Sequence, residues 1–136
     1  MLKLGFDLHG VIDTFPVFPE LINKLVEEPE VEIHVITGLA RAEADDKIGH
    51  LIDLSRVKYF SVADHLMGRP DVDVTWDENG LPWADETAWN NSKAEYCAAE
   101  DIDILFDDSP TYAKTFESID TLYCQVHNPN RKRFRD

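Results

Sequence analysis

The chain has little cysteine, no long apolar run and no apolar segment at its start of the kind found in a signal peptide. Its two cysteines, Cys97 and Cys124, do not form a pair with metal-site spacing, so we expect reduced thiols, as in an intracellular protein. The apolar runs are far too short to span a bilayer, which excludes a membrane-spanning protein. These absences predict a soluble, cytoplasmic protein with no membrane partner.

Basic residues are also scarce. The 136 residues include 13 Lys or Arg and 27 Asp or Glu, which gives a formal net charge of −14. An acidic protein repels polyanions, so this balance excludes a main role in coating nucleic acid or anionic membranes. The hydrophobic share of 43% is ordinary for a folded domain, and the acidity therefore does not indicate disorder.

The end of the chain departs from this acidic composition. Residues 131–136 are four basic residues, one Phe and one Asp. A short charged chain end is typically solvated. The alternative for this basic tail, residues 129–136, is a contact with nucleic acid.

Short apolar segments alternate with amphipathic ones along the chain. The segments that predict strands are Leu2–Leu8, Val31–Ile36, Lys58–Val62, Ile102–Phe106 and Thr121–Val126. Four segments have a helical pattern: one begins near Pro16, one covers about 39–54, one leads up to about Glu100 and one covers Thr111–Glu117. This alternation predicts right-handed crossovers, and hence an α/β fold with a mostly parallel five-stranded sheet and helices on both faces. The length predicts one domain, residues 1–136.

Glycine and proline interrupt the alternation between about residues 63 and 90. Polar and apolar residues alternate over 72–76 and lead to Asn79-Gly80, which is a strong hairpin signal. We therefore predict a small hairpin insert. The tryptophans in or beside it are Trp76, Trp83 and Trp89. They would pack the insert against the sheet or, alternatively, form a lid that stacks a flat group such as a nucleobase.

Polar residues follow several of the predicted strands, at the edge where open parallel sheets bind their ligands. They are Asp7 and His9, Thr37 and Gly38, and Asp107 and Asp108, with Lys93 at the start of the helix before the fourth strand. Aspartates from separate strands can share a hard cation, and a lysine and a threonine can hold phosphoryl oxygens. An aspartate can also be a nucleophile, although a single one could merely cap a turn. The pattern indicates metal-dependent phosphoryl chemistry.

These residues resemble the motifs of the haloacid dehalogenase (HAD) superfamily. The first motif, Asp-x-Asp-Gly-[Thr/Val], is similar to residues 7–11, Asp-Leu-His-Gly-Val, and Thr37, Lys93 and Phe106-Asp107-Asp108 follow in the order of the other motifs. The resemblance implies a three-layer Rossmannoid (HAD-like) fold, with strand order 5-4-1-2-3 and a rudimentary cap at the insert. It also implies a Mg²⁺-dependent phosphatase.

The resemblance also implies individual roles. Asp7 would be the nucleophile, and Thr37 and Lys93 would hold the phosphate. The metal ligands would be Asp7, the backbone carbonyl of His9, and the pair Asp107 and Asp108. Gly38 and Arg41 are the further candidates for substrate binding. For Arg41, as for Asp13 and Thr14, which also flank the presumed cleft, the alternative is a role on the surface.

His9 stands where the family has its second aspartate, the general acid/base. An imidazole with an ordinary pKa near 6.5 can protonate a leaving oxygen or activate water. The alternative is that His9 cannot reach the leaving group, which would leave a weak enzyme or an inactive metal-binding or regulatory domain.

The predicted substrate is a small phosphorylated molecule. A nucleotide is the first candidate, because Val11 and the pair Asp107-Asp108 resemble the deoxyribonucleotidase branch of the family. The end of a polynucleotide is an alternative that an open cleft and a basic tail would suit.

Overall fold

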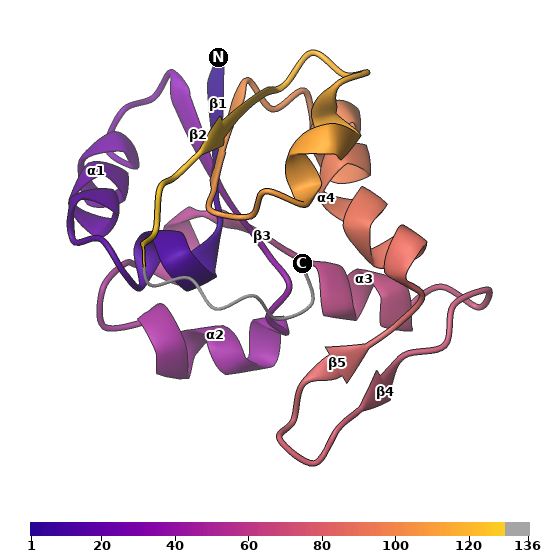
Figure 1. Cartoon of the computed structure of the whole chain (residues 1–136). Helices are drawn as coiled ribbons and strands as arrows, with labels where there is room; N and C mark the ends of the chain where they lie inside the picture. Colours follow the sequence, from indigo (N-terminus) through magenta and orange to yellow (C-terminus); the bar gives the residue numbers. More distant parts are fainter. Residues whose placement is uncertain (130–136) are drawn as a thin grey trace.

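A parallel sheet forms the centre of the computed structural model, which describes residues 1–129 (Figure 1). Its strands are β1 (Leu2–Phe6), β2 (Val31–Thr37), β3 (Lys58–Ser61), β6 (Ile104–Asp107) and β7 (Leu122–Gln125). They lie in the order β3-β2-β1-β6-β7, and all neighbours are parallel. The predicted α/β class and five-stranded parallel sheet are confirmed, with the strand order that the resemblance implies. Of the predicted basic tail, residues 130–136 lie outside the described range.

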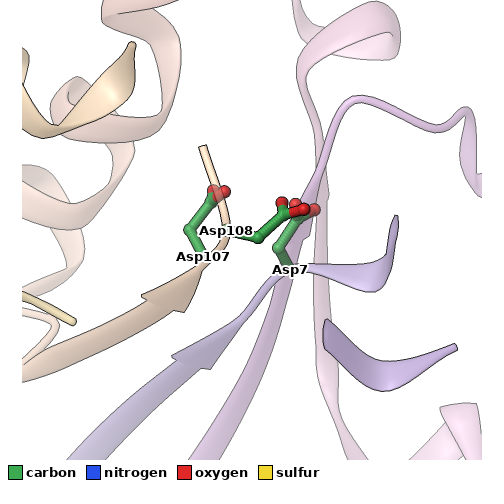
Figure 2. A group of neighbouring side chains, drawn as sticks. All are labelled: Asp7, Asp107 and Asp108. Atoms are coloured by element: carbon green, nitrogen blue, oxygen red, sulfur yellow. The ribbon is translucent and has the colours of Figure 1, made fainter. Parts of the chain in front are cut away.

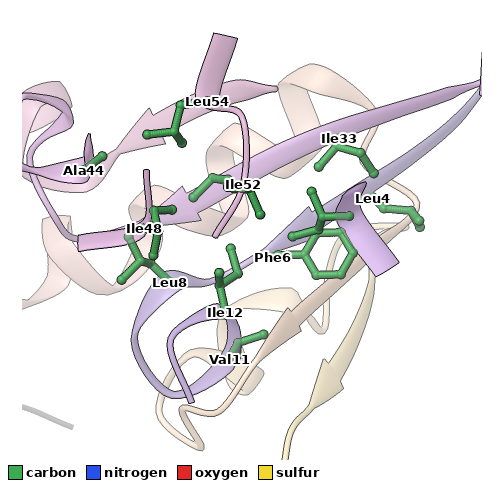
Figure 3. Packing of buried hydrophobic residues seen from close by; sticks show 12 residues of the cluster. Leu4, Phe6, Leu8, Val11, Ile12, Ile33, Ala44, Ile48, Ile52 and Leu54 are labelled. Carbon is green, nitrogen blue, oxygen red and sulfur yellow. The ribbon is translucent and has the colours of Figure 1, made fainter. Parts of the chain in front are cut away.

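The larger apolar core lies between the sheet and helices α1 (Val17–Leu25) and α2 (Arg41–Ile48) (Figure 3). Leu4 and Phe6 of β1 both reach this core, because alternate side chains of a strand point to the same face. They belong to one cluster with Ile48 of α2. Burying a Leu, Ile or Phe side chain fully contributes about 1.5–3 kcal/mol, so this cluster fixes the two helices against the sheet.

Helix α4 (Glu86–Glu100) covers the opposite face of the sheet. Cys97 of this helix packs in a second cluster with Ile36 of β2 and Leu105 of β6. The helices predicted on both faces are therefore present (Figure 1). Within residues 1–129, none of the helices has the length and apolar character needed to cross a membrane.

Two predicted helices are shorter in the structure. The pattern over 39–54 produces only α2, which ends at Ile48. The chain turns after this residue, yet Ile52 and Leu54 remain buried in the same core, so the apolar spacing reflects burial and not a continuous helix. The segment predicted as a helix over Thr111–Glu117 forms only a short 3₁₀ turn, Tyr112–Phe116.

The region predicted as an insert contains the hairpin but is helical at both ends. Its elements are α3 (Val62–Met67), β4 (Thr75–Trp76), β5 (Pro82–Trp83) and the start of α4. The strands β4 and β5 are antiparallel and two residues long. Helix α3 was not predicted; it begins directly after β3 because the Ser61 side chain accepts the Asp64 N–H (3.0 Å) and so caps the helix.

Candidate active site

Three aspartates meet at the carboxyl ends of β1 and β6 (Figure 2). Phe6 pairs with Phe106, so Asp7 and Asp107 are the next residues on neighbouring strands, and Asp108 follows. One carboxylate oxygen from each aspartate lies within 4.8 Å of the others. Their exposed fractions are 7%, 0% and 6%. The structure thus brings together three of the residues predicted for a metal site, and it buries all three.

Lys93 lies at this cluster and brings a positive charge to it. Its Nζ donates a hydrogen bond to Oδ2 of Asp107 (2.6 Å) and lies 3.3 Å from Oδ1 of Asp7. The side chain is buried and reaches the cluster from the middle of α4, whereas the sequence predicted Lys93 at the start of the helix. The helix starts earlier because Asp85 caps it by accepting the Ala88 N–H (2.9 Å).

The positive charge of Lys93 does not balance the negative charges of Asp7, Asp107 and Asp108. Burial alone would lower the pKa of Lys93, but Asp107 and Asp7 outweigh it, so the pKa is raised and the ammonium stays charged. Burial, followed by the charge of Asp107, raises the pKa of Asp7 to about 7, although Lys93 opposes the rise. Among residues 1–129, the Lys93 ammonium thus lies against Asp7 and Asp107 in a cluster of three buried carboxylates, an arrangement that attracts a further cation.

Asp107 and Asp108 have different surroundings. Besides Lys93, Asp107 accepts the backbone N–H of Ser109 at its Oδ1 (3.0 Å), so both of its oxygens already have a donor. Asp108 lies beside the amide of Asn128, whose Nδ2 is 3.4 Å from Oδ2 of Asp108. Asp107 is thus held mainly by Lys93 and the backbone.

The loop after β1 is shaped by Gly10. This residue has a φ of +81°, which side chains rarely tolerate, and an added Cβ would lie 2.0 Å from Oδ2 of Asp108. The loop also holds the Asp7 carboxylate, since the Leu8 N–H donates to Oδ1 of Asp7 (2.8 Å). Glycine is therefore required for the loop to pass close to the carboxylates.

His9 points toward solvent and is held by Asp13. The His9 side chain is 57% exposed, and its Nδ1 lies 3.0 Å from Oδ2 of Asp13. The hydrogen bond to Asp13 raises the pKa of His9, while burial opposes the rise. Asp13 also accepts the Gly10 N–H (2.9 Å) and the Thr14 hydroxyl (2.7 Å). Asp13 was predicted only as a flanking residue; its spacing of four from His9 is the signal that indicates the pairing.

Thr37 and Gly38 lie at the end of β2. Thr37 is buried, and it lowers the pKa of Asp7, so the predicted phosphate-binding threonine lies beside the predicted nucleophile. A Cβ at Gly38 would lie 2.8 Å from Cζ2 of Trp89. A tryptophan of α4 therefore packs directly on this loop.

Arg41 is engaged away from the carboxylates. Its Nη1 lies 3.5 Å from Oδ2 of Asp45, and its guanidinium carbon lies 5.4 Å from the ring centre of Tyr59. These contacts are with α2 and β3. The substrate-binding role expected of Arg41 stays a prediction.

Tyr112 is a residue near the site that the sequence did not indicate. Nζ of Lys93 lies 4.8 Å from the centre of its ring, a cation–π distance. Nε1 of Trp89 donates a hydrogen bond to the Tyr112 hydroxyl (2.9 Å). Trp89 and Lys93 are four residues apart and so share one face of α4; this spacing is the only local signal for the arrangement.

Comparison of the chain with protein-family models, with curated proteins and with solved structures found no match. The interpretation of the site therefore depends on its geometry and on the residues that form it.

Proposed function

We propose that this chain is a Mg²⁺-dependent phosphomonoesterase with an HAD-like fold, acting through an aspartyl-phosphate on Asp7. The observation that carries the proposal is the buried cluster of Asp7, Asp107 and Asp108 with Lys93, at the carboxyl edge of a parallel sheet. That edge is where open α/β sheets bind their ligands. A phosphate ester alone would be repelled there, so the proposal requires a divalent cation.

The side chains present fit Mg²⁺. This ion prefers oxygen ligands and is usually held by one or two carboxylates together with water and phosphate oxygens. Asp7 and Asp108, with the backbone carbonyl of His9, are the proposed ligands. Asp107 has one oxygen on Lys93 and the other on the Ser109 N–H, so we assign it to holding Lys93. When bound, Mg²⁺ would supply positive charge to the phosphoryl oxygens.

Asp7 is the proposed nucleophile. Its Oδ1 accepts the Leu8 N–H and lies 3.3 Å from Nζ of Lys93, which favours Oδ2 as the attacking atom. Oδ2 would form a bond to phosphorus while the bond from phosphorus to the leaving oxygen breaks. Lys93 and Thr37 are the residues of this chain that would hold the phosphoryl oxygens during the transfer.

His9 is the proposed acid and base. Asp13 engages Nδ1 of His9, so Nε2 is the atom that would give a proton to the leaving oxygen. The neutral imidazole would then take a proton from a water molecule, whose oxygen attacks phosphorus and displaces Oδ2 of Asp7. The products are the alcohol and inorganic phosphate, and Asp7 and His9 return to their starting states.

The test is phosphate release from a panel of small phosphate esters, with Mg²⁺ and with EDTA. We expect turnover that requires Mg²⁺ and that Asp7→Asn abolishes. The matched control is Asp46→Asn, which changes an exposed aspartate of α2 in the same way. Full activity of Asp7→Asn, or equal rates in EDTA, would contradict the proposal.

A metal-binding or regulatory domain without turnover is the second candidate. The exposure of His9, at 57% of its side chain, favours it, because an efficient acid/base is usually enclosed with its substrate. Calorimetric binding of Mg²⁺ with no phosphate release at any pH from 5 to 8 would establish this candidate in place of the enzyme.

A polynucleotide-end phosphatase is a narrower form of the first proposal. It depends on the basic tail, of which residues 130–136 lie outside the described residues. Removing residues 131–136 should then lower activity on an oligonucleotide end while leaving activity on small esters unchanged.

A further inference from the structure

Asp13 connects the loop after β1 to the ring of His9. Its Oδ2 lies 3.0 Å from Nδ1 of His9, while its Oδ1 accepts the backbone N–H of Gly10 (2.9 Å) and the hydroxyl of Thr14 (2.7 Å). An exposed side chain samples several rotamers, and His9 is mostly exposed. The contact with Asp13 therefore restrains a ring that the core does not enclose.

The backbone of the loop holds Asp13 in place. The Asp13 N–H donates to the carbonyl of Leu8 (3.1 Å), and the Ile12 N–H donates to the carbonyl of Asp7 (3.3 Å). Leu8 and Ile12 are both buried in the larger core. The loop is thus closed by its own hydrogen bonds and anchored by apolar side chains, so the Asp13 carboxylate has a set position beside the ring.

This arrangement decides which nitrogen of His9 carries the hydrogen. An aspartate is ionised at neutral pH, and a carboxylate only accepts hydrogen bonds, so Nδ1 of His9 must be the donor. A neutral imidazole has one N–H and one lone pair, which leaves the lone pair on Nε2. The proposed reaction needs it there: Nε2 takes a proton from water, whose oxygen bonds to phosphorus while the bond from phosphorus to Oδ2 of Asp7 breaks.

We propose that Asp13 is a positioning residue that holds neutral His9 in the tautomer with its hydrogen on Nδ1 and its lone pair on Nε2. Gly10 and Thr14 contribute by engaging Oδ1, which leaves Oδ2 for the ring. This inference rests on the proposed function for the use of the lone pair, but the tautomer itself can be measured without turnover.

Replacing Asp13 by asparagine should reverse the tautomer. The Gly10 N–H can only donate, so the amide oxygen in Asp13→Asn must take the place of Oδ1. The amide nitrogen then faces Nδ1 of His9 and donates to it, which moves the hydrogen of the neutral ring to Nε2. In that tautomer Nε2 has no lone pair with which to accept a proton from water.

The first measurement is nitrogen NMR of the imidazole rings in the full chain with Mg²⁺, at a pH where the rings are neutral. Signals that disappear in His9→Gln belong to His9. We expect the hydrogen on Nδ1 in the wild-type chain and on Nε2 in Asp13→Asn. The control Asp46→Asn, which changes an exposed aspartate of α2, should keep the wild-type tautomer. A hydrogen on Nε2 in the wild-type chain, or the same tautomer in Asp13→Asn, would overturn the inference.

The second measurement is the time course of para-nitrophenyl phosphate hydrolysis. Nitrophenolate leaves without being protonated, so Asp7 can still take the phosphoryl group in Asp13→Asn, but water is no longer activated. We expect rapid release of about one nitrophenolate per chain, followed by a kcat lower by about 10²–10⁴. A purely structural role for Asp13 would slow the rapid phase as well, and that result would overturn the inference.

The two measurements separate failure of this inference from failure of the proposed function. Phosphate release by the wild-type chain, with an unchanged tautomer in Asp13→Asn, would leave the phosphatase and remove the role of Asp13. A reversed tautomer, with no phosphate release by the wild-type chain, would leave the positioning of His9 by Asp13 and remove the phosphatase.

Discussion

Replacing Lys93 by methionine tests the electrostatic basis of the site. The lysine is 2% exposed, and its Nζ lies 2.6 Å from Asp107 and 3.3 Å from Asp7. Methionine is apolar and flexible, so Lys93→Met leaves two buried carboxylates without their partner while still filling most of the space. Breaking a buried ion pair by removing one partner costs about 3–5 kcal/mol. We expect the free energy of unfolding in EDTA to fall by about this amount.

The assay is unfolding by guanidinium chloride, with Lys114→Met as the control because Lys114 is exposed. That variant should change the free energy of unfolding by about 0.5 kcal/mol or less. A double variant, Lys93→Met with Asp107→Asn, should lose less than the sum of the two single losses, because contacting residues are coupled by about 0.5–3 kcal/mol. If Lys93→Met lost no more stability than Lys114→Met, the reasoning about a buried charge cluster would be refuted.

Three further predictions follow from other parts of the structure. Gly10→Ala should lose at least about 1–2 kcal/mol of unfolding free energy and bind Mg²⁺ more weakly by calorimetry, because its Cβ would lie 2.0 Å from Oδ2 of Asp108. The control Gly68→Ala, whose Cβ would come no nearer than 3.5 Å to other atoms, should show neither change. Equal behaviour of the two variants would contradict the predicted clash. Burial lowers the pKa of His34 below its unfolded value near 6.5, so the unfolded chain binds the proton more readily and the free energy of unfolding should fall as the pH drops below about 6.5. Denaturant titrations at several pH values should show a smaller fall in His34→Gln. The same pH dependence of stability in both proteins would count against the prediction. His9→Ala should lower kcat by about 10²–10⁴ in steady-state assays, and an unchanged kcat would remove the histidine from the reaction.

The meeting of Asp7 with Asp107 could be predicted from the sequence. Each aspartate directly follows a short apolar segment, and parallel strands end at the same edge of a sheet. The pairing of Phe6 with Phe106 then places the two residues side by side. The signals needed were local hydrophobic runs and the residues that follow them, both of which are visible in the sequence.

Other features depend on contacts between distant segments. Ile52 and Leu54 carry an apolar spacing that extends the predicted helix, but they reach the core from a turn. The apolar spacing therefore reflects burial. A continuous helix and a helix followed by a turn can both bury these residues, and the sequence does not distinguish between them. Whether Lys93 lies at the start or in the middle of α4 depends on where the helix begins. Asp85 sets this boundary by capping the helix, but an acidic chain contains many other aspartates that could act as the cap.

The sequence by itself determined the α/β class, the parallel sheet and the residues that end its strands, because these depend on hydrophobic periodicity within short segments. Only the tertiary structure decided the surroundings of those residues. It buried Lys93 between two aspartates, placed Tyr112 over its ammonium, and set Trp89 against Gly38. These contacts join segments far apart in the chain. They depend on side-chain volumes and directions across the packed layers, and local sequence patterns do not predict either.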